Sequence, residues 1–252
     1  MTGIVENNLG TSNGERQKGI KRFSGDKSLG AVELKDILEK YVCQDDAKHI
    51  IYVAEPTAQE EVMRVSLEEL LTTIQQKIRE GVKQFFIPIC LQNSKVARTF
   101  MGVGGHFTCI YVDYEANTIE CYDSHVNDDS VIGGRLGLLK NHLRKTQFEA
   151  LDKTNARLEI NELKVVIQEY IEQQFGSRLT IIDAPKTQLQ KDNINCGRFM
   201  THYILHRREK ESLKEYIQGV TNQVEAKGYD VFIEGVKQEV VKKMQEETPQ
   251  EP

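Results

Sequence analysis

Residues 106–124 read HFTCIYVDYEANTIECYDS, and this stretch decides the fold prediction. Two β-rich apolar runs, from Phe107 to Val112 and from Thr118 to Tyr122, enclose the turn-like segment 113–117. Apolar runs of this length on either side of a short polar turn are typical of two paired strands. The sequence therefore predicts a buried antiparallel hairpin.

The expected register of this hairpin brings two polar residues together. A four-residue loop over 113–116 would pair Val112 with Asn117. The same register sets His106 directly opposite Asp123, and opposed residues have Cβ atoms about 4.5–5.5 Å apart. A carboxylate there can accept the Nδ1 proton of the imidazole, fix its tautomer and leave Nε2 to act as a base. The alternative is a surface histidine beside an aspartate at the end of a strand.

The segments on either side of the hairpin follow helical and β-rich patterns. The clearest helix opens with a capping box formed by Ser66 and Glu69 and stops at Gly81. Further elements are expected as helices over 31–41, from about Asn161 and from Asn195 or Cys196, and as strands over 49–53, 84–89 and 179–182. This order of elements, without an internal repeat, predicts an α+β fold.

Length and composition limit the class of protein. The chain has 252 residues, which allows one ordinary domain or two small ones. We expect a disordered N-terminal tail over 1–30, a single domain over 31–240 and a flexible C-terminal tail over 241–252. No apolar stretch is long enough to span a bilayer, and the N-terminus lacks the pattern of a secretory signal peptide. The net charge of −5 gives no positive field for nucleic acid, which is therefore not expected as a partner.

One of the five cysteines stands in a reactive context. Their odd number and the lack of CxxC spacing argue against a disulfide framework or a zinc site and favour reduced thiols in the cytosol. Cys196 begins an amphipathic helix, where the helix dipole and unsatisfied amides favour the thiolate, and Gly197 would keep the approach to it open. Six residues earlier, Gln190 can supply an oxyanion donor. The alternative for Cys196 is an ordinary core cysteine. Buried core thiols are the expectation for Cys90, Cys109 and Cys121.

Together these pieces resemble the clan CE cysteine proteases, which are the Ulp/SENP peptidases of ubiquitin-like modifiers and their bacterial effector relatives. The resemblance rests on chain order, on the gap of 17 residues between His106 and Asp123 (123 minus 106), and on the gap of six between Gln190 and Cys196 (196 minus 190). It implies a papain-like or adenain-like α+β fold, in which a central mixed β-sheet is flanked by helices. It spans about residues 84–205, the implied catalytic core, and leaves 31–82 as a variable helical region.

The resemblance also implies a role for each site residue. His106 would be the general base, Asp123 the acid that orients it, Cys196 the nucleophile and Gln190 the oxyanion donor. Family members commonly have a tryptophan after the catalytic histidine, over the slot for the Gly-Gly tail of the modifier. Here that position is Phe107, which is therefore the expected substrate-binding residue.

The activity implied by the resemblance is that of a thiol isopeptidase, a deubiquitinase or ubiquitin-like-protein protease that cleaves after the C-terminal Gly-Gly of a modifier through a thioester. Such an enzyme needs no cofactor and no metal. The expected partners are conjugates of ubiquitin, SUMO or NEDD8, and the expected form is a monomer in a reducing cytosol. Compact clan CE proteins with flexible tails are often bacterial virulence effectors secreted into host cells, which is the second expectation for its location.

Two other functions are compatible with the sequence. A YopJ-type acetyltransferase effector would use the same triad with acetyl-CoA and would need an inositol phosphate site. The basic residues available for that site are Arg135, Lys140, Arg144 and Lys145. A non-enzymatic binding module on a degenerate protease scaffold is the other alternative, although the complete set of four site residues argues against it.

Three further histidines were weighed as site residues. His125 lies two residues beyond Asp123 and is a weaker candidate for a catalytic role. His202 and His206 have the i, i+4 spacing that can bind a metal, but no acidic residue joins them as in an HExxH motif. No metal site is therefore expected from the sequence.

Overall fold

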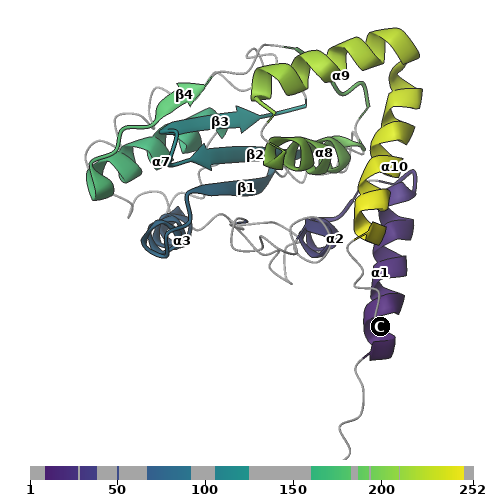
Figure 1. Ribbon diagram of the computed structural model, residues 1–252, viewed down its shortest axis with the longest axis horizontal. Helices are drawn as coiled ribbons and strands as arrows, with labels where there is room; N and C mark the ends of the chain where they lie inside the picture. Colours follow the sequence, from purple (N-terminus) through teal and green to yellow (C-terminus); the bar gives the residue numbers. More distant parts are fainter. Residues whose placement is uncertain are drawn as a thin grey trace, which may run out of the picture.

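A four-stranded β-sheet lies at the centre of the molecule, with helices on both of its faces (Figure 1). The computed structural model describes residues 9–27, 29–38, 50, 67–91, 106–124, 160–182, 187–192, 194–209 and 211–246. The strands lie in the order β1 (Gln84–Leu91), β2 (His106–Asp113), β3 (Thr118–Tyr122) and β4 (Thr180–Ile182). The first three pair antiparallel and β4 pairs parallel to β3, so the predicted α+β fold with a mixed sheet is confirmed.

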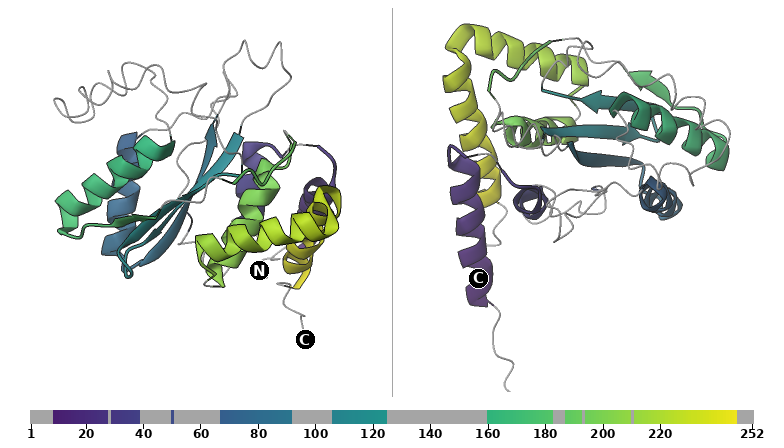
Figure 2. Two further views of the ribbon diagram at one scale, coloured as in Figure 1. Left: turned by 90° about the horizontal axis from the view of Figure 1, so that it is seen from above. Right: turned by 180° about the vertical axis from the view of Figure 1, so that it is seen from behind.

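The helices form one layer on each face of the sheet (Figure 2). On one face lie α3 (Leu67–Arg79) and α7 (Ile160–Phe175). On the other lie α8 (Cys196–Arg208), α9 (Leu213–Lys227), α10 (Tyr229–Glu246), α1 (Leu9–Ser24) and α2 (Ala31–Ile37). Among the described residues, no helix is long and apolar enough to cross a membrane.

Alternating side chains of the strands fill two separate cores. Ile110 and Val112 of β2 belong to the core beneath α3 and α7, whereas Cys109 and Tyr111 belong to the core beneath α8. Such alternation follows from the period of two residues in a strand. Both faces of the sheet are therefore apolar, which explains why the runs in the sequence are almost continuously hydrophobic.

The hairpin is confirmed, but its register differs from the predicted one. Asp113 pairs with Thr118, so the loop covers 114–117 and not 113–116. The last loop residue, Asn117, has a φ of 54°, a left-handed conformation that asparagine tolerates well. Asp113 also fixes the turn because its Oδ1 accepts a hydrogen bond from the amide of Ala116 at 2.8 Å.

The corrected register changes the expected pairing at the open end of the hairpin. Continued along the ladder, it sets position 123 opposite Thr108, and not opposite His106 as predicted. Positions 106 and 123 become diagonal neighbours, which in antiparallel sheets are about 7–8 Å apart. A shift of two residues keeps a position on the same face of a sheet. Positions 106 and 123 therefore still share a face, and only the distance between them is larger than predicted.

Most of the predicted elements are confirmed, and several end where the sequence indicates. Helix α3 stops before Gly81 and α7 stops before Gly176, and both glycines have positive φ angles, of 84° and 70°. Ser66 of the expected capping box lies outside the described residues. Of the expected strand over 49–53, only Ile50 is described, and it forms a bridge with Phe86 of β1.

The prediction of two unstructured tails is wrong in part, because each tail contains residues of a helix that packs against the core beneath α8. Helix α1 lies within 1–30 and Phe23 near its end is fully buried. Helix α10 continues past position 241 to Glu246, with Met244 fully buried. The two helices lie side by side in Figure 1, and their apolar residues enter the core beneath α8. Helices α9 and α10 come after the last helix that the sequence predicts, so neither of them was predicted.

A buried acid fixes α8 to the sheet. Tyr203 donates its hydroxyl hydrogen to Oε1 of Glu120 on β3 at 2.7 Å, and Nε of Arg207 donates to the same oxygen at 2.6 Å. The guanidinium of Arg207 lies 4.3 Å above the ring centre of Tyr111. Breaking a buried ion pair by removing one partner costs about 3–5 kcal/mol. These contacts hold α8, the helix that begins with Cys196, firmly against β2 and β3.

Candidate active site

Cys196 is the first residue of α8, as the sequence predicts. Its N-cap residue, Asn195, makes no side-chain cap hydrogen bond, and the first turn of the helix, which is fully described, contains no acidic residue. A helix N-terminus carries a partial positive charge, and the amides of its first turn have no partners within the helix. Cys196 is 4% exposed and belongs to the core beneath α8.

Gly197 allows α8 to approach β2 closely. A Cβ atom at this position would lie 3.4 Å from Phe107 Cδ2, 3.4 Å from Leu29 Cδ1 and 3.5 Å from Leu34 Cδ2. Position 197 therefore faces Phe107 and two leucines, and the role of Gly197 in keeping the approach to the thiol open stays a prediction. Phe107 is 7% exposed and lies against the first turn of α8. Its expected role in binding the substrate stays a prediction.

Gln190 is fully buried and is tied to the end of β3. Its Oε1 accepts a hydrogen bond from the hydroxyl of Ser124 at 2.8 Å. The backbone amides of Leu189 and Gln190 both donate to the carbonyl of Ser124, at 3.1 and 2.9 Å. The amide nitrogen of Gln190 donates to the backbone carbonyl of Asp192 at 2.6 Å. Ser124, which follows the predicted acid Asp123, thus fixes both the backbone and the side chain of the predicted oxyanion donor.

Asp192 organises the loop that leads into α8, and the sequence analysis did not single it out. Its Oδ1 accepts hydrogen bonds from the amides of Ile194 and Asn195 at 2.8 and 2.9 Å. Its Oδ2 accepts from Asn195 Nδ2 at 2.7 Å and from the Tyr229 hydroxyl. Burial raises the pKa of Asp192, but the hydrogen bonds outweigh it and hold the pKa below its ordinary value. An aspartate shortly before a helix start is a signal for such a turn.

Arg198 joins the start of α8 to the N-terminal segment, another contact that the sequence did not reveal. Its side chain is fully buried. Its Nε donates to the carbonyl of Phe23 at 2.7 Å, and its terminal nitrogens donate to the carbonyl of Lys27 and to Asn195 Oδ1, both at 2.9 Å. Burial lowers the pKa of Arg198, although Asp192 and other nearby negative groups oppose the change. The end of α1 is thereby attached to the first turn of α8, two residues after Cys196.

Residues next to the predicted site positions contact one another across the fold. Phe107, which follows His106, lies against Gly197, which follows Cys196. In the same way Ser124, which follows Asp123, forms two hydrogen bonds with Gln190 and a third with the amide of Leu189. The start of β2, the end of β3 and the loop before α8 therefore come together at one end of the sheet. Five of the residues singled out in the sequence lie outside the described part of the chain, as does the side chain of His106. These five are His125, Arg135, Lys140, Arg144 and Lys145.

The other described cysteines differ from Cys196. None of Cys109, Cys121 and Cys196, the three whose side chains the structure describes, is in a disulfide. Cys109 is fully buried in the core beneath α8, and Cys121 lies in the core beneath α3 and α7. Burial raises the pKa of the Cys121 thiol to about 12, which makes it unreactive. The prediction of core thiols is confirmed for Cys109 and Cys121, and Cys90 has its side chain outside the described residues.

No protein-family model matches the sequence, and no curated protein matches it. The structure is similar to several solved structures. One is the SUMO protease Ulp1 with its catalytic cysteine oxidized to a sulfenic acid, at a TM-score of 0.45 and 11% identity, covering 97% of this chain and 99% of that one. Another is the Chlamydia trachomatis effector protein ChlaDUB1, at a TM-score of 0.46 and 12% identity, covering 98% of this chain and 97% of that one.

A third is the C-terminal Ulp1 protease domain in complex with Smt3, the yeast ortholog of SUMO, at a TM-score of 0.39 and 12% identity, covering 96% of this chain and 99% of that one. At this level of similarity, the function has to be argued from the residues of this chain.

Proposed function

We propose that the protein is a thiol isopeptidase that releases ubiquitin or a ubiquitin-like modifier from its conjugates. The observation that carries the proposal is the meeting of three chain segments at the start of α8. Ser124 binds Gln190 there, and Phe107 lies against Gly197 beside the thiol of Cys196. These contacts support a site at this end of the sheet in which the candidate nucleophile, its base, its acid and an oxyanion donor come from four separate places in the sequence.

In the proposed reaction, Sγ of Cys196 attacks the carbonyl carbon of the last glycine of the modifier. His106 takes the thiol proton and later gives it to the leaving lysine amine, while Asp123 orients the imidazole. The C–N bond breaks and a thioester forms between the modifier and the enzyme. Water, activated by the same imidazole, then hydrolyses the thioester and restores the thiol.

The negative charge on the carbonyl oxygen needs donors that are already in place. Gln190 Nε2 and the amides at the start of α8 are the proposed donors, and fixed donors of this kind are each worth about 10²–10³ in kcat. The bond from Ser124 to Oε1 of Gln190 and the Asp192 turn support the position of this loop. In the structure Nε2 of Gln190 donates to the carbonyl and to Oδ1 of Asp192, so in the proposed reaction it exchanges one of these bonds for the oxyanion. The contacts of Glu120 with α8 support a rigid helix behind the thiol.

The proposed partners are conjugates of ubiquitin, SUMO or NEDD8, and the proposed place of action is a reducing compartment, because an oxidised thiol cannot attack. Delivery into a host cell as an effector stays a prediction from the sequence. Phe107 is the proposed cover of the slot for the Gly-Gly tail, a role that its position beside Gly197 supports.

Hydrolysis of fluorogenic ubiquitin, SUMO and NEDD8 substrates tests the proposal. We expect the wild-type protein to release the fluorophore from at least one modifier and Cys196→Ala to release none. Cys121→Ala is the matched control, because Cys121 lies in the core on the other face of the sheet. If Cys121→Ala loses activity with Cys196→Ala, or if folded wild-type protein cleaves none of the three, the proposal is wrong.

A further inference from the structure

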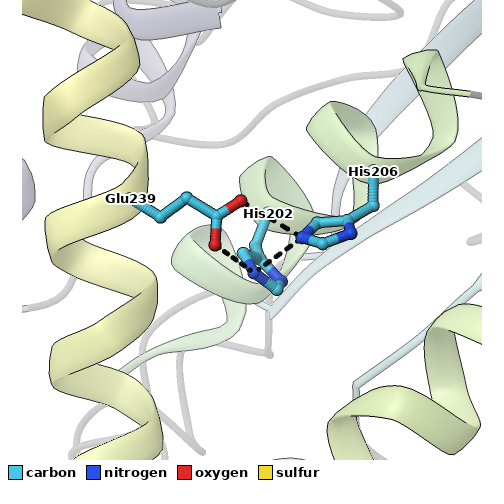
Figure 3. A group of neighbouring side chains, drawn as sticks. All are labelled: His202, His206 and Glu239. Carbon is cyan, nitrogen blue, oxygen red and sulfur yellow. Dashed lines mark hydrogen bonds and ion pairs between the residues drawn. The ribbon is translucent and has the colours of Figure 1, made fainter.

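Two histidines of α8 and a glutamate of α10 point toward one another (Figure 3). The Nε2 atoms of His202 and His206 are 3.1 Å apart. Glu239 places Oε2 3.4 Å from Nε2 of His202 and Oε1 3.2 Å from Nε2 of His206. One ligand atom from each of the three residues lies within 4.8 Å of the others. The acid that the HExxH pattern lacks is therefore supplied by a different helix.

The other nitrogen of each imidazole has its own partner. Nδ1 of His206 lies 2.6 Å from Oε2 of Glu211, and a carboxylate can only accept, so this nitrogen carries the hydrogen. Nδ1 of His202 lies 2.9 Å from the hydroxyl of Tyr216, which donates its own hydrogen to the carbonyl of Phe199 at 3.4 Å. With the hydroxyl hydrogen on the Phe199 carbonyl, neutral His202 carries its hydrogen on Nδ1 as well, and this is the tautomer on which the proposal below is built.

This tautomer leaves both Nε2 lone pairs directed at one another and at the carboxylate. Three electron-pair donors then face one point, and a metal cation or a proton there would offset their repulsion. Protein metal sites use the same device, in which a ligating histidine gives its second N–H to a carboxylate or another acceptor that fixes the ring. Glu211 and Tyr216 occupy those supporting positions here.

The spacing of the three groups fits a small divalent transition metal. Zinc binds histidine nitrogen at about 2.0–2.1 Å and carboxylate oxygen at about 2.0–2.2 Å, so tetrahedral ligand atoms are about 3.3–3.5 Å apart. The 3.1 Å between the two Nε2 atoms lies close to this range. Each of these nitrogens has a different oxygen of Glu239 nearby, Oε2 at 3.4 Å from His202 and Oε1 at 3.2 Å from His206, so the carboxylate faces both histidines. The side chain of His202 is 4% exposed, while those of His206 and Glu239 are 26% and 47% exposed. The site is thus anchored on one side and open for metal entry on the other.

We propose that His202, His206 and Glu239 form a binding site for a divalent transition metal, with Zn²⁺ as its natural ion and water as the fourth ligand. The metal joins α8 to α10. Six residues separate His202 from Cys196 along α8, about 9 Å of helix rise, so the metal does not reach the reacting thiol. It is a structural clamp on the helix that carries Cys196, and the inference does not depend on the proposed activity.

The test is Zn²⁺ binding to the full chain, without an affinity tag and in the Cys196→Ala background, so that this thiol cannot bind the ion. After treatment with a chelator, titration calorimetry should show one equivalent of Zn²⁺ bound. Zn²⁺ at a hundredfold excess over Kd should raise Tm by about 5–10 °C. Glu239→Gln and His206→Gln should each weaken binding by more than about 100-fold, and Glu211→Gln, which keeps all three ligands, by about 10–100-fold.

The control is Glu225→Gln, which removes an exposed carboxylate of α9 and should leave Zn²⁺ binding unchanged. Circular dichroism without metal checks that every variant folds, and Glu239 is exposed enough for its amide to be tolerated. Co²⁺ should give visible d–d absorption without a thiolate charge-transfer band, as nitrogen and oxygen ligands predict. The proposal is overturned if no equivalent of Zn²⁺ binds, or if Glu239→Gln binds Zn²⁺ as tightly as Glu225→Gln. In either case a protonated His206 neutralises the cluster in place of a metal.

Discussion

Replacing Arg198 with methionine tests whether the N-terminal segment is held to the start of α8. Methionine keeps the unbranched shape of the side chain but removes the guanidinium. The carbonyls of Phe23 and Lys27 and the side-chain oxygen of Asn195 then lose their donor, at 2.7, 2.9 and 2.9 Å respectively. The bonds to Phe23 and Asn195 are buried and the bond to Lys27 is part-buried, so two buried acceptors would lose this donor.

The expected magnitude follows from these bonds. A hydrogen bond to a charged group is worth about 1.5–3 kcal/mol, while removal of a buried charge recovers part of its desolvation cost. Each buried acceptor left without a donor costs about 1–3 kcal/mol, so over the three bonds, after this recovery, we expect Arg198→Met to lose about 3–5 kcal/mol of stability. For a domain of this size, 1 kcal/mol shifts Tm by about 2–4 °C, so Tm should fall by about 6–20 °C.

Thermal and urea unfolding measure this loss, and limited proteolysis reports where it acts. The segment that contains α1 should be cleaved earlier in Arg198→Met than in the wild type. Arg178→Met is the control, because its side chain is 78% exposed and its contact with Glu172 is 3.9 Å long. If Arg198→Met is no less stable than Arg178→Met, Arg198 does not anchor the N-terminal segment and the reasoning is refuted.

Two further predictions concern the loop before α8. Ser124→Ala removes the bond to Oε1 of Gln190 and should lower kcat by about 10–100-fold with little change in KM, since a displaced oxyanion donor affects the transition state more than binding. Steady-state kinetics with Ser124→Thr as the conservative variant checks it, and an equal rise of KM in both variants would contradict it. Asp192→Asn should destabilise the fold by about 1–2 kcal/mol at neutral pH, through weaker hydrogen bonds to the turn. Because the pKa of Asp192 is lowered on folding, its contribution is complete above the unfolded pKa of about 3.9 and is lost as pH falls below that value. Urea unfolding at several pH values should therefore show the two proteins converge below about pH 4, and a difference that stays constant to lower pH would refute this assignment.

The hairpin and the major helices of the sheet layers could be predicted because their signals are local. Runs of apolar residues mark β1, β2 and β3, and glycines with positive φ mark the ends of α3 and α7. The register could not be fixed in the same way. It depends on whether Asp113 belongs to the loop or to the strand, and the pairing of Asp113 with Thr118 settles this only once both strands are placed.

Helix α1 was missed because its stability comes from residues far away in the chain. Its sequence contains three glycines and few apolar residues, so its pattern resembles that of an unfolded tail. Phe23 is buried only because α10 packs beside α1 and Arg198 binds the carbonyls that follow. Neither of these partners can be inferred from the segment itself.

In the candidate site, too, local sequence signals reveal some residues and only the folded chain reveals others. Cys196 and Gln190 could be named because their spacing and position before a helix are visible in the sequence. Ser124 and Arg198 could not, because their roles consist of hydrogen bonds between segments that meet only in the folded chain. Glu239 belongs to the same class, since it reaches the two histidines of α8 from another helix.

The most direct test of the central claim is covalent capture of the candidate nucleophile. Ubiquitin, SUMO and NEDD8 probes that carry an electrophile at the C-terminus should be incubated with the reduced protein, and mass spectrometry should locate the modified residue. The account predicts a stable adduct with at least one probe, on Cys196, and none with Cys196→Ala. Folded protein that reacts with none of the three probes, or an adduct on another cysteine, would contradict it.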